Sequence, residues 1–266
     1  MLACVFPIKN HCSTASLVVV NELSVIALLS FSLSLVFALG GVGSALILVP
    51  ALMGLGIPGS VARPIGLLVN TASLGGGSLY NLKTGKFKPR SWWLLIAFSL
   101  PAAPAGAWLS TLVPQETLLG FFACFMIFSS FLMVRPARQK KERTDDSCPL
   151  GTGALLGTVS GVISGLLGVG SGGVLIPVLH SMRFRSHQIA MVTALAVPFS
   201  SFTGFLAYTV IESISLSTII VASLAALLGG IIGTRLMHRI DKQLIRKLLA
   251  LTLLISGGRL LWSLIA

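Results

Sequence analysis

Two short glycine-rich strings are candidates for chemistry, because each interrupts an otherwise apolar stretch. The first reads GVGSALILVP at residues 41–50, and the second reads GVGSGGVLIP at residues 168–177. Glycine disfavours a helix interior, so each string predicts a break after which a short helix begins. The first turn of such a helix has unpaired N–H groups and a partial positive charge, which a ligand can approach closely at glycine. The strings therefore predict an anion site built from backbone donors.

Further polar residues occur at helical spacing in the apolar segment that follows each string. Asn70 and Ser73 share one face of the first segment, and Ser201 and Tyr208 share the matching face of the second. Packing between helices is the simpler interpretation of such residues, and contact with a substrate is the functional one. No catalytic residue and no metal ligand is indicated. The candidate substrate-binding residues are Gly41, Gly43, Ser44, Arg63, Asn70, Ser73, Tyr80, Gly168, Gly170, Ser171, Gly172, Gly173, Thr193, Ser201 and Tyr208.

The composition indicates that a membrane surrounds these residues. Of the 266 residues 55% are hydrophobic and only 10% are charged, and the stretches 91–115 and 188–211 hold no charge. This balance is typical of a polytopic membrane protein. Lys and Arg outnumber Asp and Glu by 19 to 7, but the excess falls in short segments between apolar runs. That pattern favours membrane topology over nucleic-acid binding as the reason for the positive charge.

Ten apolar segments predict an all-α fold. A helix needs about 20 residues to cross the hydrocarbon core, and the second and seventh segments have only 12 each. These two are expected either to re-enter as hairpins with the glycine strings at their tips or to cross fully with the topology unchanged. The segments are 23–39, 44–55, 64–82, 91–111, 117–134, 150–167, 171–182, 188–210, 217–236 and 244–265.

The second half of the chain repeats the first. The glycine strings match at an offset of 127 residues, which becomes 128 where the only two tyrosines, Tyr80 and Tyr208, align. Five segments in each half, an odd number, predict inverted repeats about an axis in the membrane plane. The predicted organisation is an N-terminal tail at 1–22, a first repeat at 23–135, a basic cytoplasmic linker at 136–149 and a second repeat at 150–266.

Basic residues set the predicted orientation. They cluster at 83–90, 135–143, 183–185 and 235–247, and the positive-inside rule places these loops in the cytoplasm. The loops at 56–63, 111–116 and 211–216 then lie outside, where Arg63 is the one basic residue. Arg63 is expected either to guide an anion or to lie among lipid headgroups. Both termini are predicted outside the cytoplasm in an inner or plasma membrane.

The acidic residues favour an anionic substrate. All seven lie in loops, in tails or at segment margins, whereas cation pathways and proton relays usually place a carboxylate inside the membrane. The four cysteines form no CxxC pair, so neither a disulfide framework nor a zinc site is indicated. We expect a small anion and the lipid bilayer as partners, with no nucleic acid and no cofactor. A homodimer is left open.

The sequence resembles the TauE/SafE family of membrane permeases, also called the sulfite exporter or toluene sulfonate uptake permease family. The resemblance rests on GLLGVGSGGVLIPVL at 165–179, AMVTALAV at 190–197, and the weaker first copies ALGGVGSALILVPAL and VARPIGLLVNTAS. It implies a permease of two related halves that moves sulfite or organosulfur anions, commonly outward. Ile65 stands where the family often has Thr in the first copy, so a symmetric two-threonine site is not implied. The residues carried over are Gly168, Gly170, Ser171, Gly172, Gly173, Pro177 and Thr193.

The predicted function is therefore a permease that moves a small anion, sulfite or an organosulfonate, outward through a site near the bilayer midplane. Two other functions compete with it. In a membrane scaffold or assembly factor without transport activity, the glycines would only allow close helix packing. An intramembrane enzyme is disfavoured, because the sequence has no HExxH motif, no GxSxG motif and no carboxylate pair within an apolar segment.

Overall fold

The apolar segments form helices wherever the chain is described. The computed structural model describes residues 12–38, 43–83, 92–134, 150–182, 184, 186–212, 215–236 and 242–265, and every regular element in these ranges is an α-helix. The helices are α1 (Cys12–Ala38), α2 (Ala45–Gly54), α3 (Gly59–Lys83), α4 (Trp93–Leu112), α5 (Gln115–Val134), α6 (Leu150–Leu167), α7 (Gly172–Ser181), α8 (Ser186–Ile211), α9 (Leu216–Leu236) and α10 (Lys242–Ile265). The expected linker at 136–149 lies outside the described residues.

Each predicted segment corresponds to one helix, and the two ends that differ most are both N-terminal. Helix α1 begins at Cys12, inside the stretch that the sequence assigns to a tail. Helix α3 begins at Gly59, because the carbonyl of Pro58 accepts hydrogen bonds from the N–H groups of Val61 and Ala62 (3.0 and 2.9 Å). Arg63 is therefore a helical residue, although the sequence places it in a loop.

The outer helices present apolar surface of the kind that a bilayer covers. Within the described residues, α4, α5, α8 and α9 are long and apolar enough to cross a membrane. Large side chains such as Trp108, Phe121, Phe128 and Val210 point away from the protein core, and all four are more than half exposed. Water would disfavour so large an apolar surface, whereas acyl chains match it. The helices thus support the expected membrane location.

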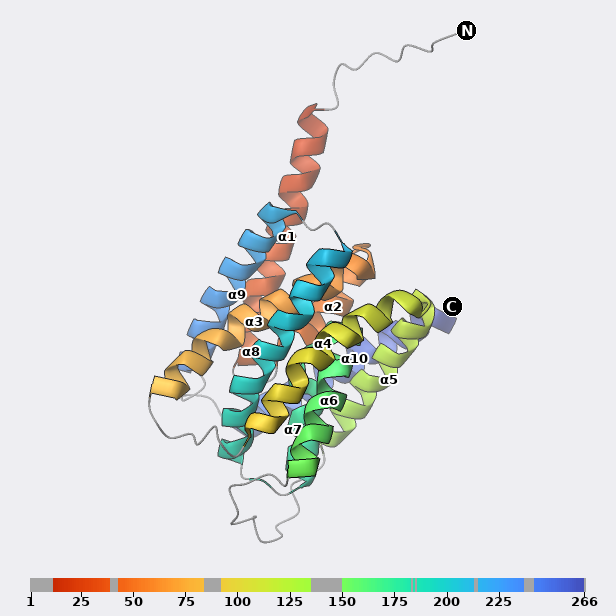
Figure 1. Cartoon of the computed structure of the whole chain (residues 1–266). Helices are drawn as coiled ribbons and strands as arrows, with labels where there is room; N and C mark the ends of the chain where they lie inside the picture. Colours follow the sequence, from red (N-terminus) through yellow and green to blue (C-terminus); the bar gives the residue numbers. More distant parts are fainter. Residues whose placement is uncertain are drawn as a thin grey trace.

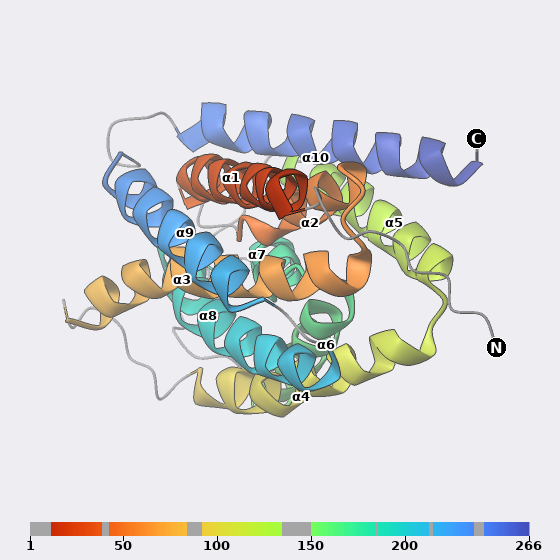
Figure 2. The same cartoon turned by 90° about the horizontal axis from the view of Figure 1, so that it is seen from above.

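The long helices pack in pairs around a centre that holds the two short ones. Helix α4 packs along α6, α1 along α9, α5 along α10, and α3 along α8. Figure 1 shows α1 beside α9 and α5 beside α10, and the view from above in Figure 2 shows α2 and α7 between the outer pairs. Contacts with the long helices therefore hold the two short helices in place.

Glycine allows two of these pairs to approach at backbone distance. A methyl group on Gly106 of α4 would overlap the carbonyl oxygen of Val162 in α6, and one on Gly233 of α9 would overlap that of Leu35 in α1. Small residues at such contacts are typical of helix association in membranes. Gly106 and Gly233, which lie outside the two strings, therefore allow close helix packing.

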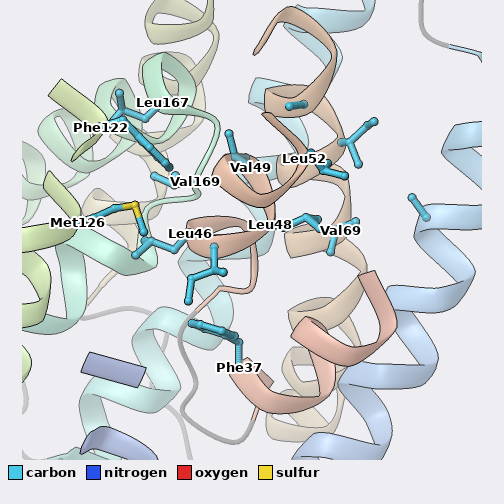
Figure 3. Packing of buried hydrophobic residues seen from close by; sticks show 14 of the residues in the cluster. Phe37, Leu46, Leu48, Val49, Leu52, Val69, Phe122, Met126, Leu167 and Val169 are labelled. Carbon is cyan, nitrogen blue, oxygen red and sulfur yellow. The ribbon is translucent and has the colours of Figure 1, made fainter. Parts of the chain in front are cut away.

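Helix α2 is buried over its first six residues and at Leu52. Its residues Leu46, Leu48, Val49 and Leu52 belong to the hydrophobic core. Figure 3 shows these side chains next to residues of α1, α3, α5, α6 and the turn before α7, which are Phe37, Val69, Phe122, Met126, Leu167 and Val169. Because protein surrounds the helix, its unpaired terminal N–H groups are shielded from lipid, as a break at membrane depth requires.

Candidate functional site

Helices α2 and α7 begin in the same way. Each has 10 residues with a proline at its sixth position, Pro50 or Pro177, and each is preceded by an N-cap serine, Ser44 or Ser171. Neither serine side chain forms a capping hydrogen bond. The first N–H groups of both helices consequently keep their capacity to bind an acceptor.

The two N-termini lie against each other. A methyl group in place of hydrogen on Gly172 would lie 3.7 Å from the backbone nitrogen of Gly43, and one on Gly173 would touch the side chain of Leu46. Each helix start carries a partial positive charge of about half an elementary charge, so their approach is repulsive unless an acceptor lies nearby. The arrangement therefore favours a negative or strongly polar group at the junction.

The side chain of Asn70 in α3 reaches this junction. A methyl group on Gly43 would overlap its Oδ1, and a methyl group on Gly170 would overlap its Nδ2. Asn70 is completely buried, and its Nδ2 donates to Oγ of Ser201 in α8 at 3.1 Å. Its Oδ1 has no hydrogen-bond partner among the described residues. We call this set, Gly43, Asn70, Gly170, Gly172 and Ser201, the elbow contact.

Backbone conformation explains why glycine precedes α7. Gly168 and Gly170 have φ values of +73° and +78°, a region that residues with a Cβ rarely adopt. A side chain at either position would also overlap a neighbour, because Arg63 fills the space beside Gly168 and Asn70 fills the space beside Gly170. Both requirements, conformation and close approach, apply at this one turn.

Buried serines join the helix starts to their neighbours. Oγ of Ser44 lies 3.3 Å from Oγ of Ser34 in α1, and Oγ of Ser171 lies 2.8 Å from Oγ of Ser200 in α8. All four residues are buried. Hydroxyl groups both donate and accept, so these pairs can exchange a protein partner for a ligand at low cost.

A second polar cluster lies two turns away along α3. The hydroxyl of Tyr208 donates to the carbonyl of Gly165 (2.9 Å) and lies 2.8 Å from Oγ of Ser110. The guanidinium of Arg63 lies close enough to act electrostatically on the same hydroxyl. Arg63 and Tyr208 are 8% and 2% exposed, so the cluster combines a full positive charge with nearly complete burial. We call Arg63, Ser110 and Tyr208 the arginine cluster.

The predicted candidates thus separate into two groups and a remainder. Thr193 is fully buried, and its hydroxyl donates to the carbonyl of Ile189 in its own helix at 2.8 Å. The backbone of Ser73 packs against Gly230 of α9, away from the elbow contact. Gly41 and the side chain of Tyr80 lie outside the described residues. Gly43, Gly170, Gly172 and Gly173 surround the junction of α2 and α7, together with the N-cap serines, Asn70 and Ser201, whereas Gly168 lies against Arg63.

Sequence reasoning did not identify Ser34, Ser200 or Ser110. Each is one of many serines in apolar segments, and no local pattern distinguishes it from a packing residue. Ser200 adjoins a candidate, Ser201, but adjacent positions on a helix point in directions about 100° apart. Only the packing of α8 against α7 brings Ser200 to Ser171, so a signal would have to come from tertiary contacts.

Comparison with known proteins identifies one family and several relatives. A family model described as "Sulfite exporter TauE/SafE" matches residues 26–260. A probable membrane transporter protein of Sinorhizobium fredii is 24% identical over 245 residues, which cover 89% of this chain and 97% of the relative. Two probable membrane transporter proteins of Bacillus subtilis are 27% and 22% identical, over 89% and 84% of this chain and 98% and 91% of their own lengths. No solved structure gives a significant match.

Proposed function

The chain belongs to the TauE/SafE family of membrane transporters, and from this premise we propose that it is a permease, not an enzyme, that exports a small oxyanion. The substrate we propose is sulfite or a small organosulfonate, bound at the elbow contact between two inverted repeats in the cell membrane. The observation that carries the proposal is the meeting of two helix N-termini around the buried carboxamide of Asn70.

The direction of α3 and α8 supports inverted repeats. These helices occupy the same place in the two halves, and they run antiparallel, since Arg63 contacts Tyr208 at one end while Asn70 contacts Ser201 further along. Two equivalent helices that cross antiparallel are related by an axis perpendicular to both. In a bilayer such an axis lies in the membrane plane, which is the geometry of inverted-repeat transporters.

Pairs of equivalent contacts support the same arrangement. Gly106 approaches the carbonyl of Val162, and the residues 127 positions later and earlier, Gly233 and Leu35, make the corresponding contact. Between α5 and α10, Ser130 donates to the carbonyl of Ala250 at 2.7 Å. The equivalent contact joins Gly257 to the carbonyl of Ala123. Each of these interfaces joins a helix of the first half to one of the second, and exchanging the two halves reproduces the contacts.

The elbow contact can exchange its own acceptor for an anion. With no ligand, Oδ1 of Asn70 faces the backbone of Gly43 and offsets part of the positive potential there. Rotation of the carboxamide by 180° would turn its NH2 group to the same place, and the hydroxyl of Ser201 can bond to either end. An anion would then receive hydrogen bonds from both helix starts and from Asn70.

Export follows from charge and orientation. With the basic loops in the cytoplasm and both termini outside, the negative interior drives each negative charge outward by about 2.3 kcal/mol per 100 mV. The described acidic side chains, Glu116 and Glu212, lie at helix ends. Rocking of the two repeats about the elbow contact would expose the anion to each side in turn.

Flux through reconstituted protein tests the proposal. Vesicles that contain the purified chain and are loaded with sulfite should release it faster than sulfite-loaded vesicles without protein. An inside-negative potential should accelerate this release. The proposal would be overturned if vesicles with and without the protein showed equal flux of sulfite, thiosulfate, sulfate and small sulfonates.

A glycine pair separates transport from a scaffold role. Gly172→Ala places a methyl group 3.2 Å from Val197 and beside Gly43, whereas Gly54→Ala places one in open space. Both variants should fold, and only Gly172→Ala should lose flux, because it narrows the junction. A scaffold would show no such difference once both proteins are folded.

A further inference from the structure

Arg63 carries a buried charge for which no acidic partner is described. It is 8% exposed, and neither Glu116 nor Glu212, the acidic residues whose side chains are described, forms an ion pair with it. Glu212 lies at the end of α8, one turn beyond Tyr208, and is half-buried. The charge of Glu212 acts on the same Tyr208 hydroxyl, yet among the described residues Arg63 has no direct ion pair. Buried charges in membrane proteins commonly mark a path for ions.

The surrounding hydroxyls hold the guanidinium but do not satisfy it. Tyr208 uses its single proton on the carbonyl of Gly165, so its oxygen can act toward the nearby guanidinium of Arg63 only as an acceptor. Ser110 lies on the other side of that hydroxyl at 2.8 Å. One phenol oxygen cannot satisfy the five N–H donors of a guanidinium. Tyr208 is therefore a positioning residue, and donors of Arg63 stay available to a ligand.

The charged end of Arg63 lies close to the protein surface. A methyl group on Gly59 would lie 3.1 Å from Nη2 of Arg63 and 3.2 Å from Nε2 of Gln115. Gln115 is exposed and begins α5 directly after the α4–α5 loop. The loops around this point are those that the charge pattern places outside the cell.

Tight packing separates the arginine cluster from the elbow contact. Arg63 and Asn70 are seven residues apart on α3, which is about 10 Å along a helix. Between them, a methyl group on Gly66 would lie 2.8 Å from the carbonyl oxygen of Gly168, and one on Gly168 would lie 2.5 Å from Cβ of Arg63. An anion at Arg63 would thus be held apart from one at Asn70 by the turn that precedes α7.

We infer that Arg63 forms a second anion site, on the outer side of the elbow contact, which a substrate occupies on its way between that contact and the outside. The inference rests on the proposed function. The ligand class is an oxyanion with at least two acceptor oxygens, because the planar guanidinium binds such groups with two parallel hydrogen bonds. Met191 occupies the position 128 residues after Arg63, so the second half of the chain has no equivalent charge.

Concentration-dependent flux measures the contribution of Arg63. In vesicles of the full chain, Arg63→Gln should raise KM for external sulfite about 10- to 100-fold, since it removes charge-assisted hydrogen bonds to the anion. The maximal rate should change by less than about threefold, because the elbow contact stays intact. Arg259→Gln, which removes an exposed arginine from α10, is the control and should leave KM unchanged.

Two further variants guard against misfolding. Arg63→Lys keeps the charge without the planar fork, and Tyr208→Phe keeps the ring without the hydroxyl, so each should raise KM by a smaller factor, about 3- to 10-fold. If Arg63→Gln folds and has the KM of the wild type, the second site is refuted while transport stands. If Arg63→Gln does not fold, a wild-type KM in both Arg63→Lys and Tyr208→Phe refutes it in the same way. A wild-type chain that carries no oxyanion refutes the proposed function and the second site together.

Discussion

The elbow contact and the arginine cluster differ in where their positive charge comes from. At the elbow contact the charge is the partial charge of two helix starts, supplied by backbone that both halves of the chain contribute. At the arginine cluster it is one side chain, Arg63, present in the first half alone. A site made of backbone can be shared by two repeats, whereas a side chain distinguishes them.

This difference bears on function. Among single substitutions only proline removes a backbone N–H group. The elbow contact is therefore sensitive mainly to the loss of glycine and to a change of the acceptor that lies beside the helix starts. Arg63 has no such constraint, and its replacement should alter affinity on one side of the membrane while the central contact persists. Substitutions at the glycines of the elbow contact should therefore disrupt folding, whereas substitutions in the arginine cluster should change anion affinity by degrees.

The largest effect is expected for Gly170→Ala. The substitution requires φ near +78° from a residue with a Cβ and overlaps Asn70, so the variant should lose about 3 kcal/mol or more of stability and fail to yield folded, active protein. Size-exclusion profiles and thermal unfolding in detergent would measure this loss. Gly54→Ala, at a position with open space, should behave as wild type, and a stable, transporting Gly170→Ala would contradict the described turn.

The next largest effect is expected for Asn70→Asp. A carboxylate between two helix starts is locally favourable, so the variant should fold. The new carboxylate would repel a bound sulfite about 4 Å away by about 4 kcal/mol at an effective dielectric of 20. Because this repulsion weakens substrate binding, sulfite flux should fall at least about 100-fold. Ser217→Asp, which adds a carboxylate at the exposed start of α9, should not alter flux. Normal flux through Asn70→Asp would contradict anion binding at the elbow contact.

Removing the partner of Asn70 should have the smallest effect of the three. Ser201→Ala leaves Nδ2 of Asn70 without its described acceptor, which costs about 1 to 3 kcal/mol of unfolding free energy. Flux should fall only a few-fold, because the helix starts are untouched. Thr209→Val, at an exposed hydroxyl of the same helix, serves as the control. A loss of flux as large as that of Asn70→Asp would make Ser201 a primary ligand instead.

Much of the fold was predictable, because apolar length and glycine position determine where membrane helices begin and end. The short helices α2 and α7 follow from their strings, and the TauE/SafE resemblance is confirmed by the family match. The start of α3 was not predictable, because Pro64 within the helix is an ordinary signal for a loop.

The candidate site was predictable only in part, because a list of polar residues does not give their distances. Asn70 and Tyr208 were grouped as equivalent candidates, yet they belong to different clusters, since antiparallel packing of α3 and α8 places Tyr208 next to Arg63. That Oδ1 of Asn70 has no hydrogen-bond partner within the described part of the chain is a tertiary feature with no signature in the sequence.

The most direct test of the central claim is the thermal stability of wild-type chain and Asn70→Asp in detergent during titration with sulfite, with chloride at equal ionic strength as reference. If the elbow contact binds the anion, sulfite at about 100 times its Kd should stabilise the wild type by about 2.7 kcal/mol, a rise of a few degrees in Tm. The Asn70→Asp variant should lose most of this rise and keep only the part that binding at Arg63 contributes. An equal rise in both proteins, or none in the wild type at any sulfite concentration, would contradict an anion site at Asn70.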